Sequence, residues 1–101
     1  MAYKLLISPE AQEDIEFAAF WYELHKNGLG SEFILSIDAE INLISRNPLV
    51  YPKIYKHVRR AVINRFPYAI FYIVNNKIIN ILALIHQSRN PKIFKKKGAK
   101  S

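Results

Sequence analysis

Hydrophobic residues in the first quarter of the chain follow two different spacings. Residues 3–7 are a short, mostly apolar run, which predicts a β-strand. Ser8, Pro9 and Glu10 then carry the chemistry of a helix start: a hydroxyl cap, a proline at the first helical position and an acid near the positive end of the helix dipole. From there, apolar residues recur with helical spacing until Asn27–Gly28, where the helix is predicted to end. The residues on the predicted apolar face are Ala11, Ile15, Ala18, Ala19 and Tyr22.

A second helix is predicted from about Ser31–Glu32 to Asn47. Its apolar residues are spaced by three and four: Phe33, Ile34, Ile37, Ile41 and Ile44. The helix is expected to end at Asn47 because Pro48 disfavours a helical conformation in the residue before it. The short connection between the two helices predicts an antiparallel helical hairpin.

From residue 55 onward the pattern changes to the alternation and β-branched content of strands. Strands are predicted over residues 56–63, 68–74 and 78–85, with turns at 64–67 and 75–76. Three strands joined by short turns form an antiparallel meander, and the helical hairpin must bury its apolar face against that sheet. The predicted fold class is therefore α+β: an N-terminal strand and a helical hairpin packed on an antiparallel β-sheet, in the order β-α-α-β-β-β.

The length of 101 residues has room for a single domain over residues 1–101. The absence of cysteine excludes disulfides, thiolate metal sites and cysteine nucleophiles. Neither an apolar stretch of the ~20 residues that a membrane helix needs nor a secretory signal is visible, so a cytoplasmic protein without a membrane partner is expected.

Lysines after Pro91 predict a mobile basic tail from about residue 95. The aromatic residues of the first helix are expected in the core rather than as a base-stacking platform: Phe17, Phe20, Trp21 and Tyr22.

The charges are divided between the two ends of the sequence. The formal net charge is +7, from 15 Lys and Arg against 8 Asp and Glu. All eight carboxylates lie in residues 1–40, whose net charge is −6, whereas residues 41–101 carry no carboxylate and a net charge of +13. A fold with this division presents a basic layer, which attracts phosphate backbones or acidic polypeptides. A solubilising surface without a ligand is the alternative.

Candidate chemistry lies at the end of the last predicted strand and in the turn at 64–67. His86 ends that strand, and Arg89 follows in a loop that can aim its guanidinium beside the imidazole, where the two could hold a phosphate or donate a proton. Alternatively, His86 bonds its own loop and Arg89 pairs with a helix carboxylate. Arg65 lies next to Phe66 and Tyr68, an arrangement suited to stacking or phosphate contact, or to a solvated turn arginine.

The remaining polar residues suggest little further chemistry. Arg59 and Arg60 are adjacent on a predicted strand, so they project from opposite faces and only one can join a given site. His25 and His57 lack the spacing of metal ligands and are expected to be structural or exposed. Residues 41–101 offer no carboxylate pair for acid–base catalysis or metal binding, and three glycines do not make a phosphate-binding loop. Neither a metal nor a cofactor is expected.

Two stretches of the β half resemble a known superfamily of toxins. Residues 65–72 (RFPYAIFY) and 81–91 (ILALIHQSRNP), combined with the order of the elements, look like the RelE/ParE toxin superfamily. Residues 8–11 (SPEA) and the junction Asn47-Pro48…Tyr51-Pro52 are similar to its plasmid-stabilisation branch. The resemblance covers residues 3–94.

The resemblance implies the toxin of a type II toxin–antitoxin pair, neutralised by a cognate antitoxin whose toxin-binding segment is acidic. ParE-like members inhibit DNA gyrase and perform no chemistry. RelE-like members cut mRNA in the ribosome, using basic residues and a tyrosine or histidine near the C-terminus to drive attack by the 2′-hydroxyl. The sequence after Pro91 offers Phe94 and lysines but no tyrosine or histidine, so the pattern is closer to the ParE-like branch. An inactive remnant that only binds antitoxin is a third alternative.

Two sets of candidate site residues follow. The residues expected to bind the target or an anion are Arg59, Arg60, Arg65, Tyr68, Arg89 and Lys92. Under the RelE-like alternative, the catalytic residues would be His86, Arg89 and Arg65, and Lys53, Lys56 and Arg59 could join the same basic site.

Overall fold

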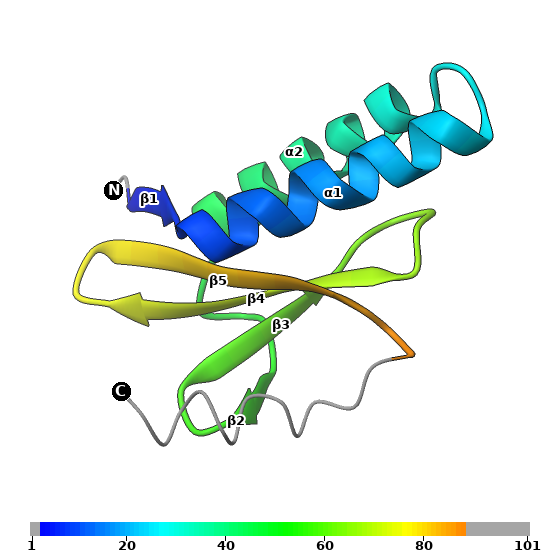
Figure 1. Ribbon diagram of the computed structural model, residues 1–101. Helices are drawn as coiled ribbons and strands as arrows, with labels where there is room; N and C mark the ends of the chain where they lie inside the picture. The colour runs from blue at the N-terminus through cyan, green and yellow to red at the C-terminus, as the bar shows by residue number, and fades with distance from the viewer. Residues whose placement is uncertain (1–2, 89–101) are drawn as a thin grey trace.

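A helical hairpin covers one face of a five-stranded sheet in the computed structural model, which describes residues 3–88 (Figure 1). The elements in chain order are β1 (Lys4–Ile7), α1 (Pro9–His25), α2 (Leu29–Arg46), β2 (Lys53–Tyr55), β3 (Val58–Val62), β4 (Tyr68–Asn75) and β5 (Ile78–His86). The strand order across the sheet is β1-β5-β4-β3-β2. The α+β class and the helical hairpin predicted from the sequence are confirmed.

The sheet differs from the predicted antiparallel meander at both edges. β1 pairs with β5 in parallel, so the sheet is mixed. The other pairs are antiparallel, and the short strand β2, which the sequence analysis did not predict, pairs with β3 at the far edge. The predicted strand over 56–63 begins only at Val58, because residues 56–57 form the turn that leads from β2 into β3. A three-residue edge strand is too short to produce an alternating pattern.

Ser8 joins β1, α1 and β5 at one point. Its Oγ accepts a hydrogen bond from the backbone N–H of Ala11 at 3.1 Å, which caps α1, and donates to the carbonyl of Leu82 at 3.1 Å. Next to this point the β4–β5 register skips Leu82, since Phe71 faces Ala83 while Tyr72 faces Ile81. The Leu84 N–H just after this irregularity is bound by a carboxylate oxygen of Asp14 at 3.3 Å. The start of α1 is therefore attached to β5, the strand between β1 and β4.

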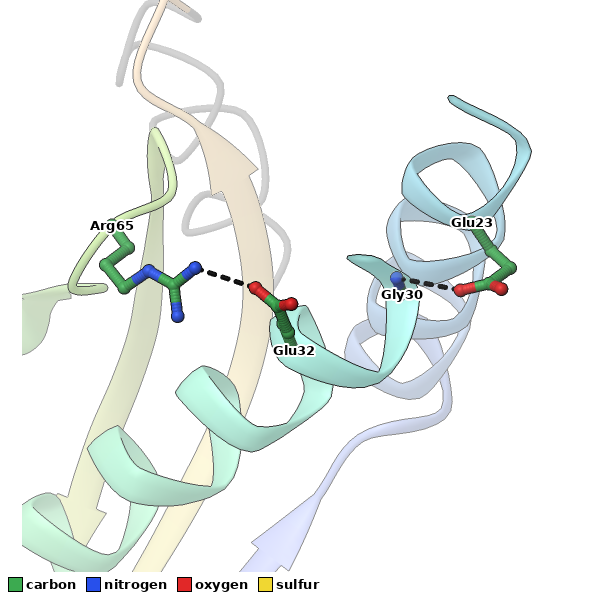
Figure 2. A network of polar contacts seen from close by, with 4 residues as sticks. All are labelled: Glu23, Gly30, Glu32 and Arg65. Atoms are coloured by element: carbon green, nitrogen blue, oxygen red, sulfur yellow. Dashed lines mark hydrogen bonds and ion pairs between the residues drawn. The ribbon is translucent and has the colours of Figure 1, made fainter. Parts of the chain in front are cut away.

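The two helices meet closely at the start of α2 (Figure 2). Gly28, the N-cap residue of α2, has a left-handed backbone (φ 86°) and no side chain to cap the helix. The carboxylate of Glu23 from α1 takes over this task, accepting the N–H groups of Gly28 and Gly30 at distances of 3.0–3.2 Å. A Cβ at position 30 would lie 2.6 Å from the carbonyl oxygen of Ala19. This cap explains why α2 begins at Leu29, two residues before the predicted start.

The core lies between the hairpin and the sheet. The largest side chains buried there are Phe33, Ile37, Ile44, Ile70, Tyr72, Ile79 and Ile81. An aromatic cluster of Tyr22, Phe33, Phe66 and Tyr68 connects both helices to the turn before β4, with ring centroids 4.9–6.2 Å apart. Burial, and then the neighbouring Tyr68, raise the pKa of Tyr22. The predicted apolar faces of both helices are confirmed as the faces that pack on the core.

The expectation that the aromatic residues of α1 are all in the core is wrong for three of the four. Tyr22 packs against the core, but Phe17, Phe20 and Trp21 are exposed, at 74%, 63% and 47% of their surface. α1 presents Ala11, Ile15 and Ala18 to the core, and the helical period of 3.6 residues turns these three aromatic side chains away from it. The helix therefore carries a second apolar face, directed to solvent.

Replacing Gly30 with alanine should destabilise the protein despite alanine's higher helix propensity. The new Cβ would meet backbone of α1, which cannot move aside as a flexible side chain would. We expect the free energy of unfolding in urea to fall by about 1–3 kcal/mol. Ser31→Ala, at the exposed next position of α2, should change it by less than about 0.5 kcal/mol. Equal effects of the two substitutions would contradict this close approach.

Candidate target-binding site

Four of the residues singled out from the sequence lie at one end of the sheet, where the turn at 64–67 enters β4 and where β5 ends: Arg60, Arg65, Tyr68 and His86. Tyr68 and His86 are directly opposite each other on β4 and β5, with their rings 5.1 Å apart in an edge-on arrangement. The N–H of Gln87 donates to the carbonyl of Pro67 at 2.8 Å, which ties the two segments together. His86 ends β5, as predicted.

The imidazole of His86 bonds its own loop. Its Nδ1 accepts the backbone N–H of Ser88 at 3.1 Å and lies 2.9 Å from the Ser88 hydroxyl. Because Nδ1 acts as an acceptor, the neutral ring carries its proton on Nε2. The nitrogen left for a ligand is therefore a hydrogen-bond donor in the neutral form. Ser88 was not among the predicted site residues, although its place two residues after the histidine is the signal that could have identified it.

His86 lines two adjoining pockets. The first, of about 320 Å³, is lined by Arg60, Val62, Ala69, Phe71, Ile85, His86 and Gln87. Its apolar members extend a small cluster centred on Ala69, Phe71 and Ala83, separate from the main core. The second pocket, of about 410 Å³, is lined by Phe17, Ala18, Trp21, Tyr22, Pro67, Tyr68 and His86. Arg60 and His86 thus share one pocket, a combination of a guanidinium, an imidazole and apolar side chains.

Arg65 is held in the turn by its backbone and by an ion pair. Its φ of 76° is left-handed, a conformation that costs about 1–2 kcal/mol for a residue with a Cβ. Its Nη2 lies 2.7 Å from a carboxylate oxygen of Glu32 in the first turn of α2 (Figure 2). The guanidinium also lies 5.6 Å from the centre of the Phe66 ring. The ion pair is half-exposed, so a ligand can reach the arginine, but an anion would have to compete with Glu32.

Arg59 and Arg60 project from opposite faces of β3, as the strand geometry requires. Arg60 is exposed and faces the pocket beside His86, whereas Arg59 binds the segment that leads from α2 to β2. The Arg59 Nη1 donates to the carbonyl oxygens of Leu49 and Tyr51 at 3.0 and 2.6 Å. The guanidinium of Arg59 therefore has a structural task that Arg60 lacks.

Two tyrosines complete the support of that segment. The hydroxyl of Tyr72 donates to the carbonyl of Pro48 at 2.7 Å, and the hydroxyl of Tyr51 donates to the Glu40 carboxylate at 2.9 Å. Burial, the hydrogen bond to Glu40 and the charge of Glu40 raise the pKa of Tyr51 to about 12. Burial also raises the pKa of Tyr72. Both phenols therefore stay protonated near neutral pH and serve as donors.

The other candidate cations lie elsewhere. Lys53 is on β2 and Lys56 follows it, at the opposite end of β3 from the turn at 64–67. The Lys56 ammonium lies 5.4 Å from the centre of the Tyr55 ring. Arg89 and Lys92, and the predicted basic tail from about residue 95, lie outside the described residues. Neither Lys53 nor Lys56 is therefore placed with His86.

All eight carboxylates lie on the helices, and six of the cations in the described residues follow α2 on the strands or the turns between them: Lys53, Lys56, Arg59, Arg60, Arg65 and Lys77. The acidic and basic parts of the sequence thus occupy different layers.

Between residues 3 and 88, no group of three or more His, Asp or Glu side chains is placed to hold a metal ion. Neither α1 nor α2 is long and apolar enough to cross a membrane.

Comparison with known proteins gives one family and several structures. Residues 5–91 match the family described as the ParE toxin of the type II toxin–antitoxin system parDE. No curated protein matches the chain in sequence.

Three of the similar solved structures are of toxin–antitoxin systems. A chain of the chromosomal ParDE system from P. aeruginosa is 17% identical, with a TM-score of 0.62 over 83% of this chain and 95% of that one. A chain of the RelBE2 complex from Mycobacterium tuberculosis is 16% identical, with a TM-score of 0.61 over 85% and 99%. A chain of the E. coli DinJ–YafQ complex is 14% identical, with a TM-score of 0.59 over 87% and 96%. At these identities the likeness is one of fold.

Arg65→Gly should remove the cation of the turn without unfolding the protein. Glycine adopts the left-handed backbone without strain, and the half-exposed ion pair with Glu32 contributes about 0–1 kcal/mol. We expect the free energy of unfolding in urea to stay within about 1 kcal/mol of the parent. Arg65→Ala, which keeps the strain and loses the ion pair, should be the less stable of the two. A loss of more than about 2 kcal/mol in Arg65→Gly would show that the ion pair matters more than its exposure indicates.

Proposed function

Because the chain belongs to the ParE toxin family of type II toxin–antitoxin systems, we propose that it arrests growth by binding DNA gyrase and that a cognate antitoxin neutralises it. The chain is the toxin component of such a system. The proposed target-binding surface is the end of the sheet around Arg60, Arg65, Tyr68 and His86. Arg89 and Lys92 follow β5 in the sequence and are proposed to contribute to the same surface.

The observation that carries this proposal is the composition of that surface. It offers cations, one imidazole and aromatic rings, and no carboxylate faces the pocket shared by Arg60 and His86. An acid–base reaction usually needs two groups of different proton affinity positioned around the reacting bond. Here the Nδ1 of His86 is held by its own loop and Arg65 is paired with Glu32. Such a surface is suited to holding a large anionic or polar partner.

The division of charge between the layers supports an antitoxin with an acidic binding segment. Positive side chains lie on the sheet and its turns, and an acidic polypeptide would be attracted to them over a distance of about a Debye length. A segment that orders as it binds can cover a large surface at some cost in entropy. The same charges would attract nucleic acid, so antitoxin and target are proposed to compete for this layer.

A ribosome-dependent endoribonuclease is the second candidate, favoured by one specific observation. Arg60 and His86 line the same pocket, and the proton on Nε2 of His86 is available to a ligand. A guanidinium that stabilises phosphate charge beside an imidazole that transfers a proton is an arrangement that attack by a 2′-hydroxyl can use. The likeness in fold to chains of the RelBE2 and DinJ–YafQ complexes is compatible with this alternative.

His86→Gln separates the two candidates. The purified full-length chain is expected to inhibit DNA supercoiling by gyrase, and the substitution should change the inhibitory concentration by less than about threefold, since it removes an imidazole but leaves the cations in place. A ribonuclease that depends on this imidazole would instead lose about 10²–10⁴ in the rate of mRNA cleavage on translating ribosomes.

Two further samples complete this experiment. Lys4→Gln, on β1 at the other edge of the sheet from β2, is the matched control and should behave as the parent in both assays. Arg60→Gln should weaken gyrase inhibition while leaving the fold unchanged by circular dichroism. Cleavage of mRNA by the parent without any effect on gyrase would contradict the gyrase proposal.

A further inference from the structure

Two exposed aromatic residues of α1 belong to the end of the sheet where the target is proposed to bind. Phe17 and Trp21, which are 74% and 47% exposed, lie one helical turn apart. Both line the pocket of about 410 Å³ that is also lined by Tyr68 and His86, and we call it the aromatic pocket. Phe20, between them in the sequence, lines a different groove, between the two helices. The rings that the sequence placed in the core are therefore divided between two surfaces.

The rings that line the aromatic pocket are held in place by one another. The His25 ring stacks on Trp21 with centroids 3.8 Å apart and planes inclined by 32°, and its Nδ1 donates to the Trp21 carbonyl at 2.8 Å. Tyr22 meets the indole nearly at a right angle, with centroids 5.2 Å apart. Tyr22 in turn packs on Tyr68 at 6.2 Å, and Tyr68 on His86 at 5.1 Å. Because these rings are already ordered by the fold, a flat ligand that stacks on them loses little further side-chain entropy.

Guanidinium groups adjoin the aromatic pocket. Arg65 is in the turn that supplies Pro67, and Arg60 lines the neighbouring pocket, which shares His86 with this one. Among the described residues that line the two pockets, none is a carboxylate. The Nε2–H of His86 adds a hydrogen-bond donor, because Nδ1 is occupied by the N–H of Ser88. Rings that stack, with cations beside them to hold a charged backbone, are the arrangement by which proteins bind single-stranded nucleic acid.

We propose that the aromatic pocket takes a nucleobase of a single nucleic-acid strand, which stacks on Phe17 and Trp21 while Arg60 and Arg65 bind neighbouring phosphates. A nucleobase has flat faces and hydrogen-bonding edges, so it can stack on the rings and accept the Nε2–H of His86. An aromatic side chain of a protein partner would fill the same pocket, but it brings no phosphate for the two guanidinium groups. The inference deepens the proposed function and rests on its surface, since it names the chemistry which that surface recognises.

Titration of the purified full chain with a single-stranded oligothymidylate of about a dozen nucleotides tests this proposal. Trp21 is the only tryptophan, so a base that stacks on it should quench the tryptophan fluorescence in a saturable manner. An abasic strand of the same length carries the same phosphates without bases, and we expect it to bind at least about tenfold more weakly. An oligouridylate of the same length tests RNA as the source of the strand, and binding of either strand supports the proposal.

Phe17→Ala and Phe20→Ala form a matched pair, since they remove the same side chain from exposed positions of α1, inside and outside the aromatic pocket. Phe17→Ala should weaken the binding of oligothymidylate by about fivefold or more, measured by the fluorescence of Trp21. Phe20→Ala should leave the affinity unchanged. Because both side chains are exposed, circular dichroism should show parental folding for both variants.

Absence of binding to both strands, or equal affinity for the intact and abasic strands, would overturn the proposal. So would equal effects of the two substitutions. A Phe17→Ala variant that keeps its affinity for the strand but loses inhibition of gyrase would also overturn it, because the aromatic pocket would then hold a side chain of the target protein. Failure of the parent to inhibit gyrase would contradict the proposed function alone, since strand binding is measured without gyrase.

Discussion

Packing of the helical hairpin against one face of the sheet determines where Arg65, Tyr68 and His86 lie. The aromatic cluster of Tyr22, Phe33, Phe66 and Tyr68 is the part of that packing closest to the site. Because Phe66 is buried under the helices, the turn around it is drawn toward the start of α2, and Arg65 then lies within reach of Glu32. Tyr68, which follows in the same cluster, is the residue against which the His86 ring packs. Losing this packing would separate the site residues from one another even if none of them were substituted.

The same packing separates the charges and divides the work among the arginines. The carboxylates lie on the helices, whereas most of the cations in the described residues lie on the strands and their turns, where their attraction for an anionic partner would weaken as ionic strength rises. The Arg59 guanidinium donates hydrogen bonds to two carbonyl oxygens, and the charge of Arg65 is partly neutralised by Glu32. Arg60, by contrast, faces a pocket that it shares with His86. The three arginines therefore differ in whether the guanidinium is already engaged within the protein or is directed to a pocket that a partner could enter. The difference arises from the face of β3 on which each side chain lies and from the segments packed against that face.

Much of the fold follows from local patterns, and the rest depends on contacts between distant residues. The helix start at Ser8 is encoded by its own residue types and was predicted. The tight turn between β4 and β5 was predicted at 75–76 and lies one residue later, at 76–77, where Asn76 has a φ of 58°. The early start of α2 was missed because its cap is the side chain of Glu23, five residues upstream of Gly28. The exposure of Trp21 was missed because hydrophobicity alone does not say which of two apolar faces a helix buries. The sequence also placed His86 at the end of a strand, but the bond from Ser88 and the pocket shared with Arg60 depend on how the strands pair.

Hydrogen–deuterium exchange of the full chain, alone and bound to the gyrase holoenzyme, tests the central claim most directly. That claim is that the protein acts by presenting the end of the sheet where the turn at 64–67 meets the end of β5. The account predicts slower exchange on binding in the backbone amides of residues 63–69 and 84–88. Protection confined to α1 and α2 or to β2, with those two segments unchanged, would contradict it.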